Sequence, residues 1–375
     1  MTEIKMVDLH GQYLKIKDEV DQAIQEVIDS SAFINGKQVS DFGNELAEYV
    51  GTKYVIPCAN GTDALQIAYQ ALGLVPGDEV IIPTFNYVAA AEAAALLGIY
   101  PVFVDVHEDT FNMDENLIED MITINTKAIV VVHLFGQSAN MRPILEIARK
   151  NGLYVIEDNA QSLGSTFTFP GKEIKMTGSI GDINTHSFFP TKNLGCFGDG
   201  GAISTDNEEL ARKALMISRH GQGQKYSYEM IGCNSRLDTL QAAILRVKLR
   251  YLDSYLENRV AAGNYYSQLL KGKAGISIPV ENKYAYHTYN QYVIKVESRN
   301  LVKEKLKIAG IPTMVYYPSP LHLQKAYVTY RDPTVKYRVS EKLCSEVLAL
   351  PIHTEITTEE QELIVNTLLK TINSL

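Results

Sequence analysis

The chain has 375 residues, of which 46% are hydrophobic and 21% charged, as in soluble globular proteins and unlike disordered, collagen-like or coiled-coil chains. A length of 375 residues predicts two domains, because a single core rarely grows so large. The 44 Asp and Glu residues outnumber the 35 Lys and Arg residues, giving a net charge of −9. Since no basic run occurs, we expect no nucleic-acid partner.

The N-terminus, MTEIKMVDLH, is polar within a few residues and lacks the apolar core of a signal peptide. No stretch reaches the roughly 20 apolar residues that cross a bilayer. The nearest, residues 89–97, is interrupted by Glu92. The four cysteines form no Cys-x-x-Cys pair. We therefore expect a cytoplasmic protein in a reducing compartment, with no membrane partner.

Short β-rich runs alternate with helical patterns through the first 205 residues. The helix after Gly61 is typical, with apolar residues at helical spacing and Gly73 and Pro76 at its end. This alternation predicts an α/β fold with a mostly parallel, doubly wound sheet flanked by helices. The predicted strands are residues 54–57, 79–83, 101–106, 128–134, 154–157, 184–188 and 202–205.

The pattern changes toward the C-terminus. Residues 166–181 contain two turn signals and predict a hairpin or loop between strands. Past about residue 250 come tyrosine-rich segments, the turn-prone residues 317–322, and a final helix opened by Thr357 with Glu360 three residues on. We expect a large domain over residues 1–250, which includes an N-terminal helical segment, and a smaller C-terminal α/β domain over residues 251–375.

Four segments carry residues suited to chemistry, and we expect each to follow a strand. They are residues 60–64, 157–161, 187–195 and 198–201. Ligands of open α/β sheets bind outside the carboxyl ends of the strands, so these distant segments should meet in one crevice.

The first segment suits the phosphate of pyridoxal 5′-phosphate (PLP). Gly61, Thr62 and Asp63 open a predicted helix, and a helix N-terminus favours a phosphate dianion through its unpaired N–H groups and its macrodipole. The hydroxyls of Thr62 and Ser187 are candidate ligands. Alternatively, Thr62 is only a helix N-cap.

The second segment suits the PLP ring. Its pyridine nitrogen must stay protonated to withdraw electrons, and a partly buried carboxylate stabilises that proton. Asp158 follows an apolar strand and is the candidate, although acidic residues at strand ends also serve as helix caps or metal ligands. Gln161 is a candidate for the ring hydroxyl, and Tyr87 for covering the ring face.

The third segment contains Lys192, between Ser187-Phe-Phe-Pro-Thr and Asn-Leu-Gly195. This apolar, turn-forming setting differs from the solvated helix face on which most lysines lie. A lysine that forms a Schiff base needs a pKa lowered by burial or by neighbouring charge. The glycines at 195, 198, 200 and 201 let the chain pass close to a ligand. We therefore predict that Lys192 holds the cofactor.

Other kinds of site have little support. The eight histidines include no His-Glu-x-x-His motif and no zinc-type spacing, so we expect no metal. Neither the Walker pattern nor the dinucleotide Gly-x-Gly-x-x-Gly pattern is present, which disfavours NTP and NAD as ligands.

Taken together, the runs SFFPTKNLG, GDGGA, IEDNAQS, ANGTDAL and GCNSRLDTLQAAI resemble the DegT-type nucleotide-sugar aminotransferases, a fold type I branch of the PLP enzymes. The resemblance extends from Val7 to His353. Relatives that dehydrate sugars carry His in place of Lys192, so the lysine favours transamination. The roles that the resemblance implies are Lys192 as the Schiff-base lysine, Asp158 on the pyridine nitrogen, Gln161 on the ring hydroxyl, and Gly61, Thr62 and Ser187 on the phosphate.

The resemblance also implies a homodimer with shared active sites, because the family's equivalent of Asn234 reaches the phosphate in the other subunit. It is closest to the branch that uses L-glutamate to aminate UDP-linked 2-acetamido-3-keto-hexuronates for surface polysaccharide such as lipopolysaccharide. Arg236 is a candidate for gripping the uronate carboxylate, but it could equally receive glutamate or be structural. Tyr316 and His322 are candidates to close over the sugar.

Three further functions stay open at this point. One is an aminotransferase for a dTDP-, GDP- or UDP-linked 3-keto or 4-keto-6-deoxy sugar. Another is a non-catalytic PLP-binding regulator, since a fold can persist without its activity. The third is a PLP enzyme that acts on a cyclitol or on an amino acid alone.

Overall fold

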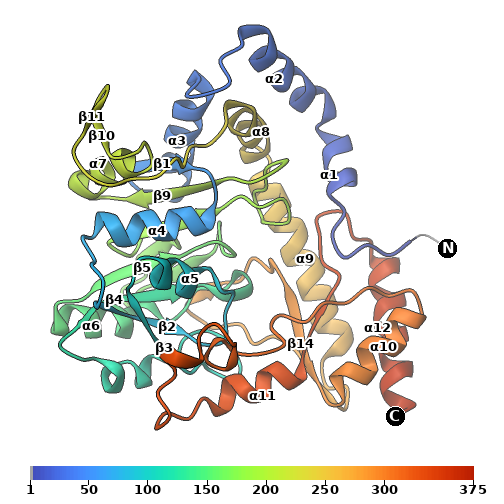
Figure 1. Cartoon of the computed structure of the whole chain (residues 1–375). Coiled ribbons are helices and arrows are strands. Elements are labelled where there is room, and N and C mark those ends of the chain that lie inside the picture. The colour runs from blue at the N-terminus through green and yellow to red at the C-terminus, as the bar shows by residue number, and fades with distance from the viewer. Residues whose placement is uncertain (1–2) are drawn as a thin grey trace.

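The computed structural model describes residues 3–375, so Met1 and Thr2 of the N-terminal stretch lie outside the described residues. Figure 1 shows a sheet with helices on both sides, and a second group of helices and strands formed by the C-terminal part of the chain. Within the part of the chain that is described, no helix is both long and apolar enough to span a membrane.

The large sheet has seven strands in the order β1-β9-β8-β5-β4-β2-β3. The pairings from β8 to β3 are parallel, and β9 is antiparallel to both of its neighbours. The prediction of a mostly parallel α/β sheet is confirmed. Its strands are β1 (Tyr54–Cys58), β2 (Glu79–Pro83), β3 (Tyr100–Val104), β4 (Thr126–Val132), β5 (Tyr154–Asp158), β8 (Ile183–Ser187) and β9 (Gly201–Thr205).

The predicted strand ends lie within two residues of the observed ones. Strand β4 is shifted by two residues at both ends, and it ends at Val132 and not at Leu134. The chain turns there into a short 3-10 helix, η3 (Leu134–Gly136), in which Phe135 has φ of 57°. An apolar sequence pattern carries no signal for that turn.

Helices cover both faces of this sheet. One face packs on α4 (Gly61–Ala71), α5 (Ala89–Leu96) and α7 (Glu208–Ile217). The other packs on α6 (Met141–Asn151) and, toward β1, on α3 (Lys37–Val50) and α8 (Thr239–Leu249). Successive residues of a strand face opposite ways, and Val130 and Val131 accordingly lie in different core clusters. Burial on both faces explains why the strands read as continuous apolar runs.

The C-terminal part builds a second core around an antiparallel sheet of β12 (Ile276–Ser277), β14 (Tyr292–Val296) and β15 (Val347–Leu350). It packs on α9 (Leu252–Leu270), α10 (Arg299–Ile308) and α12 (Thr358–Asn373). The predicted capping box of α12 is present at Thr357 and Glu360. The domain boundary at 250/251 falls between α8 and α9 and stays a prediction. Ile4, at the other end of the chain, packs in this C-terminal core.

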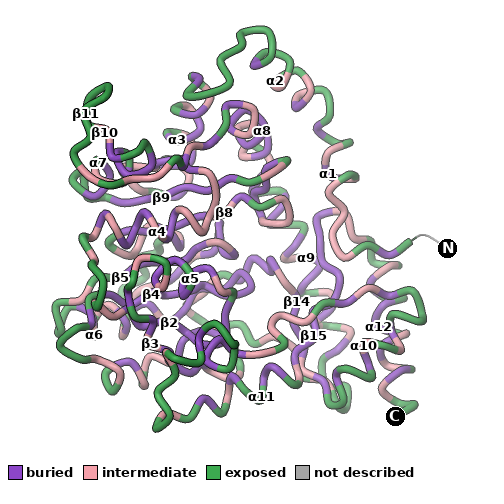
Figure 2. Tube along the Cα trace, in the orientation of Figure 1, coloured by how far each residue is buried: buried purple, intermediate pink, exposed green. Residues whose placement is uncertain are grey.

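The remaining elements lie at the periphery. The predicted turn region is a hairpin of β6 and β7, which also pairs with β13. Figure 2 shows long exposed stretches in α2 and in the β10–β11 hairpin. The bounds are α1 (Leu9–Lys15), α2 (Lys17–Ser30), β6 (Thr166–Thr168), β7 (Ile174–Met176), β10 (Gln222–Gln224), β11 (Ser227–Tyr228), β13 (Ala285–Tyr286) and α11 (Arg338–Glu346).

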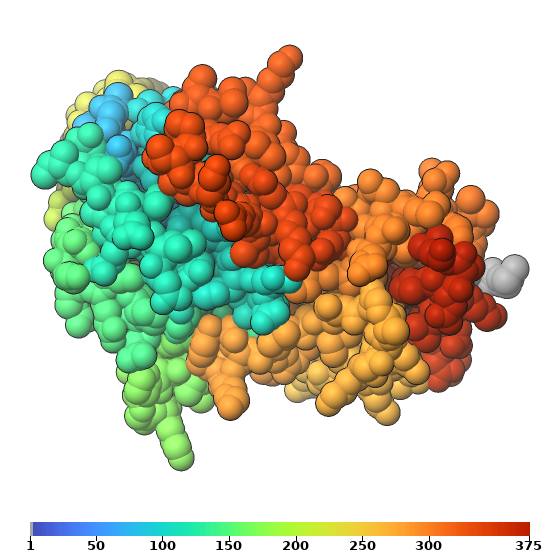
Figure 3. All heavy atoms as spheres, turned by 90° about the horizontal axis from the view of Figure 1, so that it is seen from below, coloured from blue at the N-terminus to red at the C-terminus, as the bar shows by residue number. Residues whose placement is uncertain are grey.

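A segment of the C-terminal part returns to the large sheet. Figure 3 shows this orange-red segment lying against the cyan part of the chain. Leu321, Tyr327 and Tyr337 join the core cluster of β2 and β3. Asp105, just after β3, fixes the return: it is 5% exposed and accepts hydrogen bonds from the amides of Val339 and Ser340 at 3.0 and 2.9 Å. One buried carboxylate thus caps α11 and joins it to the large sheet.

We predict that Asp105→Ala lowers the midpoint of thermal unfolding by about 3–6 °C, because several buried donors lose a charged acceptor worth about 2–3 kcal/mol. Differential scanning calorimetry measures the shift. Asp332→Ala is the matched control, since Asp332 accepts similar hydrogen bonds from Thr334 in an exposed turn. Equal shifts in the two variants would contradict a special role for Asp105.

Candidate functional site

A cavity of about 470 Å³ lies at the edge of the large sheet where β1, β2, β5 and β8 end. Residues 291, 316 and 317 of the C-terminal part close its other side. Segments more than 200 positions apart in the sequence therefore form one site. The residues that line it are Asn60, Gly61, Thr62, Leu65, Asn86, Tyr87, Ala89, Asp158, Ala160, Gln161, Ser187, Phe189, Thr191, Lys192, Asp199, Gln291, Tyr316 and Tyr317.

One end of the cavity is the N-terminus of α4. The N-cap is Asn60, whose side chain accepts a hydrogen bond from the Asp63 amide at 2.8 Å. Thr62 is therefore not the cap, and its side chain lines the cavity. A Cβ on Gly61 would lie 2.8 Å from the Cβ of Ser187, so glycine lets the helix approach the end of β8. The result is a positive helix end with two hydroxyls beside it, which suits a phosphate.

Asp158 and Lys192 carry opposite charges in the same cavity. Burial raises the pKa of Asp158, while the Ala160 amide, which donates to Oδ1 at 3.1 Å, and Lys192 oppose the shift. Burial also lowers the pKa of Lys192 to about 8, with Asp158 opposing. A lysine with a pKa of about 8 has a sizeable neutral fraction near neutrality, which a nucleophilic amine requires.

A buried network lies beneath Asp158. His133 Nε2 is 2.7 Å from Glu157 Oε2, and both side chains are fully buried. The same carboxylate accepts hydrogen bonds from the amides of Gly178, Ile180 and Gly181 at 2.9, 2.6 and 2.7 Å. Burial raises the pKa of Glu157, but these partners outweigh it and the pKa is lowered overall. The network ties β5 to β4 and to the turn before β8.

Aromatic side chains form one wall of the cavity. Gln161 donates to the Tyr317 hydroxyl at 3.1 Å and accepts from the Phe135 amide at 3.0 Å, so its amide is held in one orientation. Tyr87 is 59% exposed, and its ring centre is 6.4 Å from that of Tyr317. Tyr316 also lines the cavity. A flat ligand ring fits beside such a wall.

Three sequence-based expectations need correction. His322 does not line the cavity: it is fully buried, with Nδ1 2.8 Å from Thr84 Oγ1 and its ring stacked on Tyr337, so it fastens the returning C-terminal segment. Residues 198–201 do not directly follow a strand; they lead into β9, whose first residue is Gly201. They still reach the cavity edge because β9 is antiparallel to β8. Asp63 does not line the cavity either, and its amide is taken by Asn60.

Asn234 and Arg236 are not brought to this cavity within one chain. Asn234 is exposed and forms a β-bridge with Arg219. Arg236 and Arg219 line a different cavity of about 460 Å³, beside β1 and α7. Ser235, between the two candidates, accepts a hydrogen bond from the Ala59 amide at 3.1 Å. The segment is thus anchored next to the α4 N-terminus while its two candidate residues face elsewhere.

Sequence reasoning missed several residues of the site. The sequence pattern indicated Tyr316 but not its neighbour Tyr317. Nothing in the sequence shows that the hydroxyl of Tyr317 accepts a hydrogen bond from Gln161. Asn86, next to Tyr87, also lines the cavity. For Glu157 and His133 there was a usable signal, since both are polar residues at the ends of strands predicted to be parallel.

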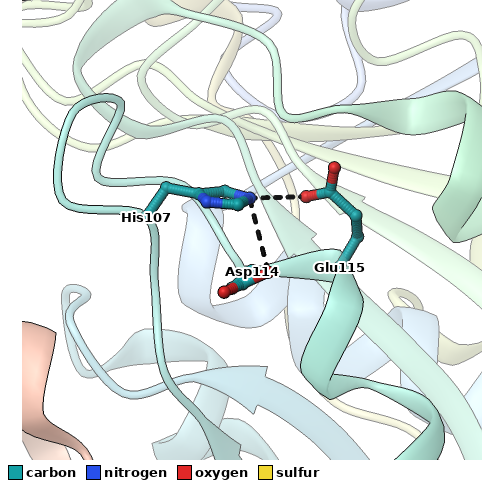
Figure 4. A group of neighbouring side chains, drawn as sticks. All are labelled: His107, Asp114 and Glu115. Atoms are coloured by element: carbon teal, nitrogen blue, oxygen red, sulfur yellow. Dashed lines mark hydrogen bonds and ion pairs between the residues drawn. The ribbon is translucent and has the colours of Figure 1, made fainter.

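Among residues 3–375, one group of side chains has ligand atoms close enough together to hold a metal ion: His107, Asp114 and Glu115 (Figure 4). His107 Nε2 is 2.7 Å from Glu115 and 3.5 Å from Asp114. The hydrogen bond that His107 donates to Glu115 raises the pKa of His107, although burial opposes the shift. Glu115 also accepts from Asn140 at 2.5 Å. The group forms an ion-pair network outside the cavity.

Relatives of known activity match almost the whole chain. The UDP-2-acetamido-2-deoxy-3-oxo-D-glucuronate aminotransferase of Pseudomonas aeruginosa is 44% identical, over 96% of this chain and 98% of that protein. The UDP-N-acetyl-3-dehydro-alpha-D-glucosamine 3-aminotransferase of Acidithiobacillus ferrooxidans is 40% identical, over 96% and 95%. A protein of Geobacillus stearothermophilus described as a pleiotropic regulatory protein is 43% identical, over 96% of both chains.

Solved structures match equally closely. DesV of S. venezuelae, in complex with a ketimine intermediate, has a TM-score of 0.94 and 36% identity, over 99% of this chain and 98% of DesV. The ntda protein of Bacillus subtilis with bound cofactor PMP has a TM-score of 0.91 and 34% identity, over 100% of this chain and 86% of that one. Residues 14–369 match the model of one family. The chain therefore belongs to the DegT/DnrJ/EryC1/StrS aminotransferase family and is a PLP-dependent sugar aminotransferase.

Proposed function

We propose that the protein transfers the amino group of L-glutamate to the keto carbon of a UDP-linked 2-acetamido-3-keto-hexuronate for surface polysaccharide biosynthesis. The observation that carries the proposal is the 44% identity, over nearly the full length of both chains, to an aminotransferase of that substrate class. The cavity also supports the proposal, because the N-terminus of α4 lies at one end of it and both Asp158 and Lys192 line it.

The residues of the cavity fit PLP. Gly61, Thr62 and Ser187 would hold the phosphate, Asp158 the protonated ring nitrogen, and Lys192 the aldehyde carbon. When bound, PLP supplies an electron sink that stabilises negative charge at the carbon being aminated. Asp158 holds the ring proton because a nearby carboxylate favours the charged form of the pyridine.

Lys192 performs the proton transfers in this proposal. Its Nζ would remove the proton from the α-carbon of glutamate and, in the second half-reaction, would deliver a proton to the former keto carbon of the sugar. The lowered pKa of about 8 suits an amine that must act as both base and acid. The aromatic wall with Tyr316 and Tyr317 limits water at the reacting atoms, and Gln161 is a candidate for the ring hydroxyl.

Sugar selectivity would come from a second subunit. We propose a homodimer in which Asn234 of each chain reaches the cofactor phosphate of the other and Arg236 binds the uronate carboxylate there. The exposure of Asn234 supports this arrangement, as does the anchoring of Ser235 beside the loop that leads into α4. The same Arg236 is a candidate for the carboxylate of glutamate.

A second candidate function has one observation in its favour. The Geobacillus stearothermophilus relative is described as a regulator, so a PLP-binding protein without turnover is the rival. Amination of a neutral 3-keto sugar is the narrower alternative, supported by the 40% identical relative.

The first test is the half-reaction with L-glutamate. We expect the visible cofactor band of the wild-type protein to convert to that of the pyridoxamine form, and borohydride to attach the cofactor to Lys192. Lys192→Ala should show neither event, whereas the exposed control Lys172→Ala should show both. Attachment to another lysine would refute the assignment, and a band that glutamate leaves unchanged would favour the regulator.

The second test concerns Arg236. Arg236→Lys should slow the half-reaction with the keto-uronate roughly 10- to 100-fold, because a bidentate grip on a carboxylate is lost. A neutral keto sugar with the same ring should react as before. Stopped-flow absorbance measures both, with Arg219→Lys as the control from the same cavity. Equal loss with glutamate would indicate a dual role, and unchanged uronate kinetics would contradict sugar recognition.

The third test is subunit mixing. Lys192→Ala and Asn234→Asp should each be inactive alone, and the purified mixed dimer should recover up to about half of wild-type activity per total site, because one of its two sites has both wild-type residues. Differently tagged subunits, copurified after exchange, give the measurement. If verified mixed dimers show no more activity than either parent, the sites are not shared.

A further inference from the structure

The loop that carries Lys192 runs from the end of β8 to the start of β9 and is closed at its neck. The Phe188 amide donates to Gly200 O and the Cys196 amide to Phe188 O, both at 2.7 Å. Within the loop, the Lys192 amide donates to Phe189 O at 2.9 Å. A Cβ on Gly195 would lie 2.3 Å from Pro190 O, so the loop folds back tightly on itself.

Two polar side chains of helix α8 bind this loop. Lys248 is 3% exposed, and its Nζ donates to Gly195 O at 2.6 Å and lies 5.6 Å from the centre of the Phe197 ring. Gln241, two helical turns earlier, accepts from the Phe197 amide at 2.9 Å and donates to Phe197 O at 3.2 Å. Residues seven apart lie on one helix face, so α8 grips the loop at two points just after Lys192.

The charge of Lys248 is costly where it lies. Burial lowers its pKa to about 8; Cys196 opposes the shift and Arg259 adds to it. No carboxylate within residues 3–375 forms an ion pair with its Nζ, whereas Lys295, another lysine with little exposure, lies between Glu108 and Asp109. A buried ammonium without a carboxylate costs several kcal/mol of desolvation. A methionine could fill the same space without that cost.

We propose that Lys248 is a positioning residue. Its hydrogen bond to Gly195 O, together with the two hydrogen bonds between Gln241 and Phe197, fixes the loop so that Lys192 enters the cavity in the direction that the cofactor requires. The inference rests on the proposed role of Lys192. It assigns to α8, which lines no part of the cavity, a direct effect on how the cofactor is held.

The test compares Lys248→Met with Lys295→Met, which removes a little-exposed lysine far from the loop. In the cofactor-free protein, hydrogen–deuterium exchange of a peptide covering residues 188–200 should become roughly tenfold faster in Lys248→Met, since a hydrogen bond worth about 1.4 kcal/mol is lost. In the holoenzyme the Kd for PLP should rise roughly tenfold for the same reason. The glutamate half-reaction should lose rate while its KM changes less than about twofold.

Thermal unfolding separates positioning from a purely structural role. Methionine removes a buried charge but leaves Gly195 O without a donor, and these effects oppose each other, so the unfolding midpoint should shift by less than about 3 °C. Unchanged loop exchange and PLP affinity in Lys248→Met would overturn the proposal, as would equal changes in Lys295→Met. Should Lys248→Met not fold, Gln241→Met, at a partly exposed site, decides by the same measurements.

The proposed role of Lys192 and the proposed role of Lys248 can be refuted independently of each other. Loop exchange is measured without cofactor or substrate, so it reports on the α8 clamp even if the chain acts on another sugar. If borohydride attached the cofactor to a different lysine, the role of Lys192 would fall while a faster-exchanging loop would still show that Lys248 holds it.

Discussion

Strands β5 and β8 are parallel neighbours and end at the same edge of the sheet, and this places Asp158 beside the loop of Lys192. Either charge alone in a cavity would cost several kcal/mol of desolvation. Here burial acts on both groups, raising the pKa of Asp158 and lowering that of Lys192, and each charge partly offsets the shift of the other. The protonation of the two groups is therefore coupled, and chemistry at either depends on the register of these strands.

Polar groups outside the cavity keep that geometry. The Glu157 carboxylate binds His133 and the turn at residues 178–181, so β4, β5 and the entry to β8 are connected through one buried anion. Asn193, next to Lys192, donates to Leu163 O at 3.0 Å and to Thr288 Oγ1 at 3.1 Å. Together with the contacts from α8, these bonds hold the loop on which Lys192 lies. A site built on strand ends gains its precision from such supporting contacts.

Much of this could be predicted from the sequence, because strands buried on both faces and a glycine-opened helix leave strong local signals. The mostly parallel sheet, the edge at which the site lies and the cavity positions of Asp158 and Lys192 follow from those signals. Contacts between segments that are distant in the sequence leave no such local signal. His322 looks like a free polar residue in a turn, yet it is buried against Thr84 and Tyr337. The N-cap is Asn60 and not Thr62, because the helix begins at Gly61, two residues earlier than a Thr62 cap would place it.

Asn234 and Arg236 mark a different kind of limit. Their segment is held at the entry to α4 by a hydrogen bond from the Ala59 amide to Ser235 Oγ. Yet neither side chain lines the cavity of its own chain. If the proposed dimer forms, the loop that shapes the phosphate end of one site also sets the position of the groups offered to the other. The exposed Asn234, and Arg236, which forms no ion pair within residues 3–375, would then acquire partners on assembly.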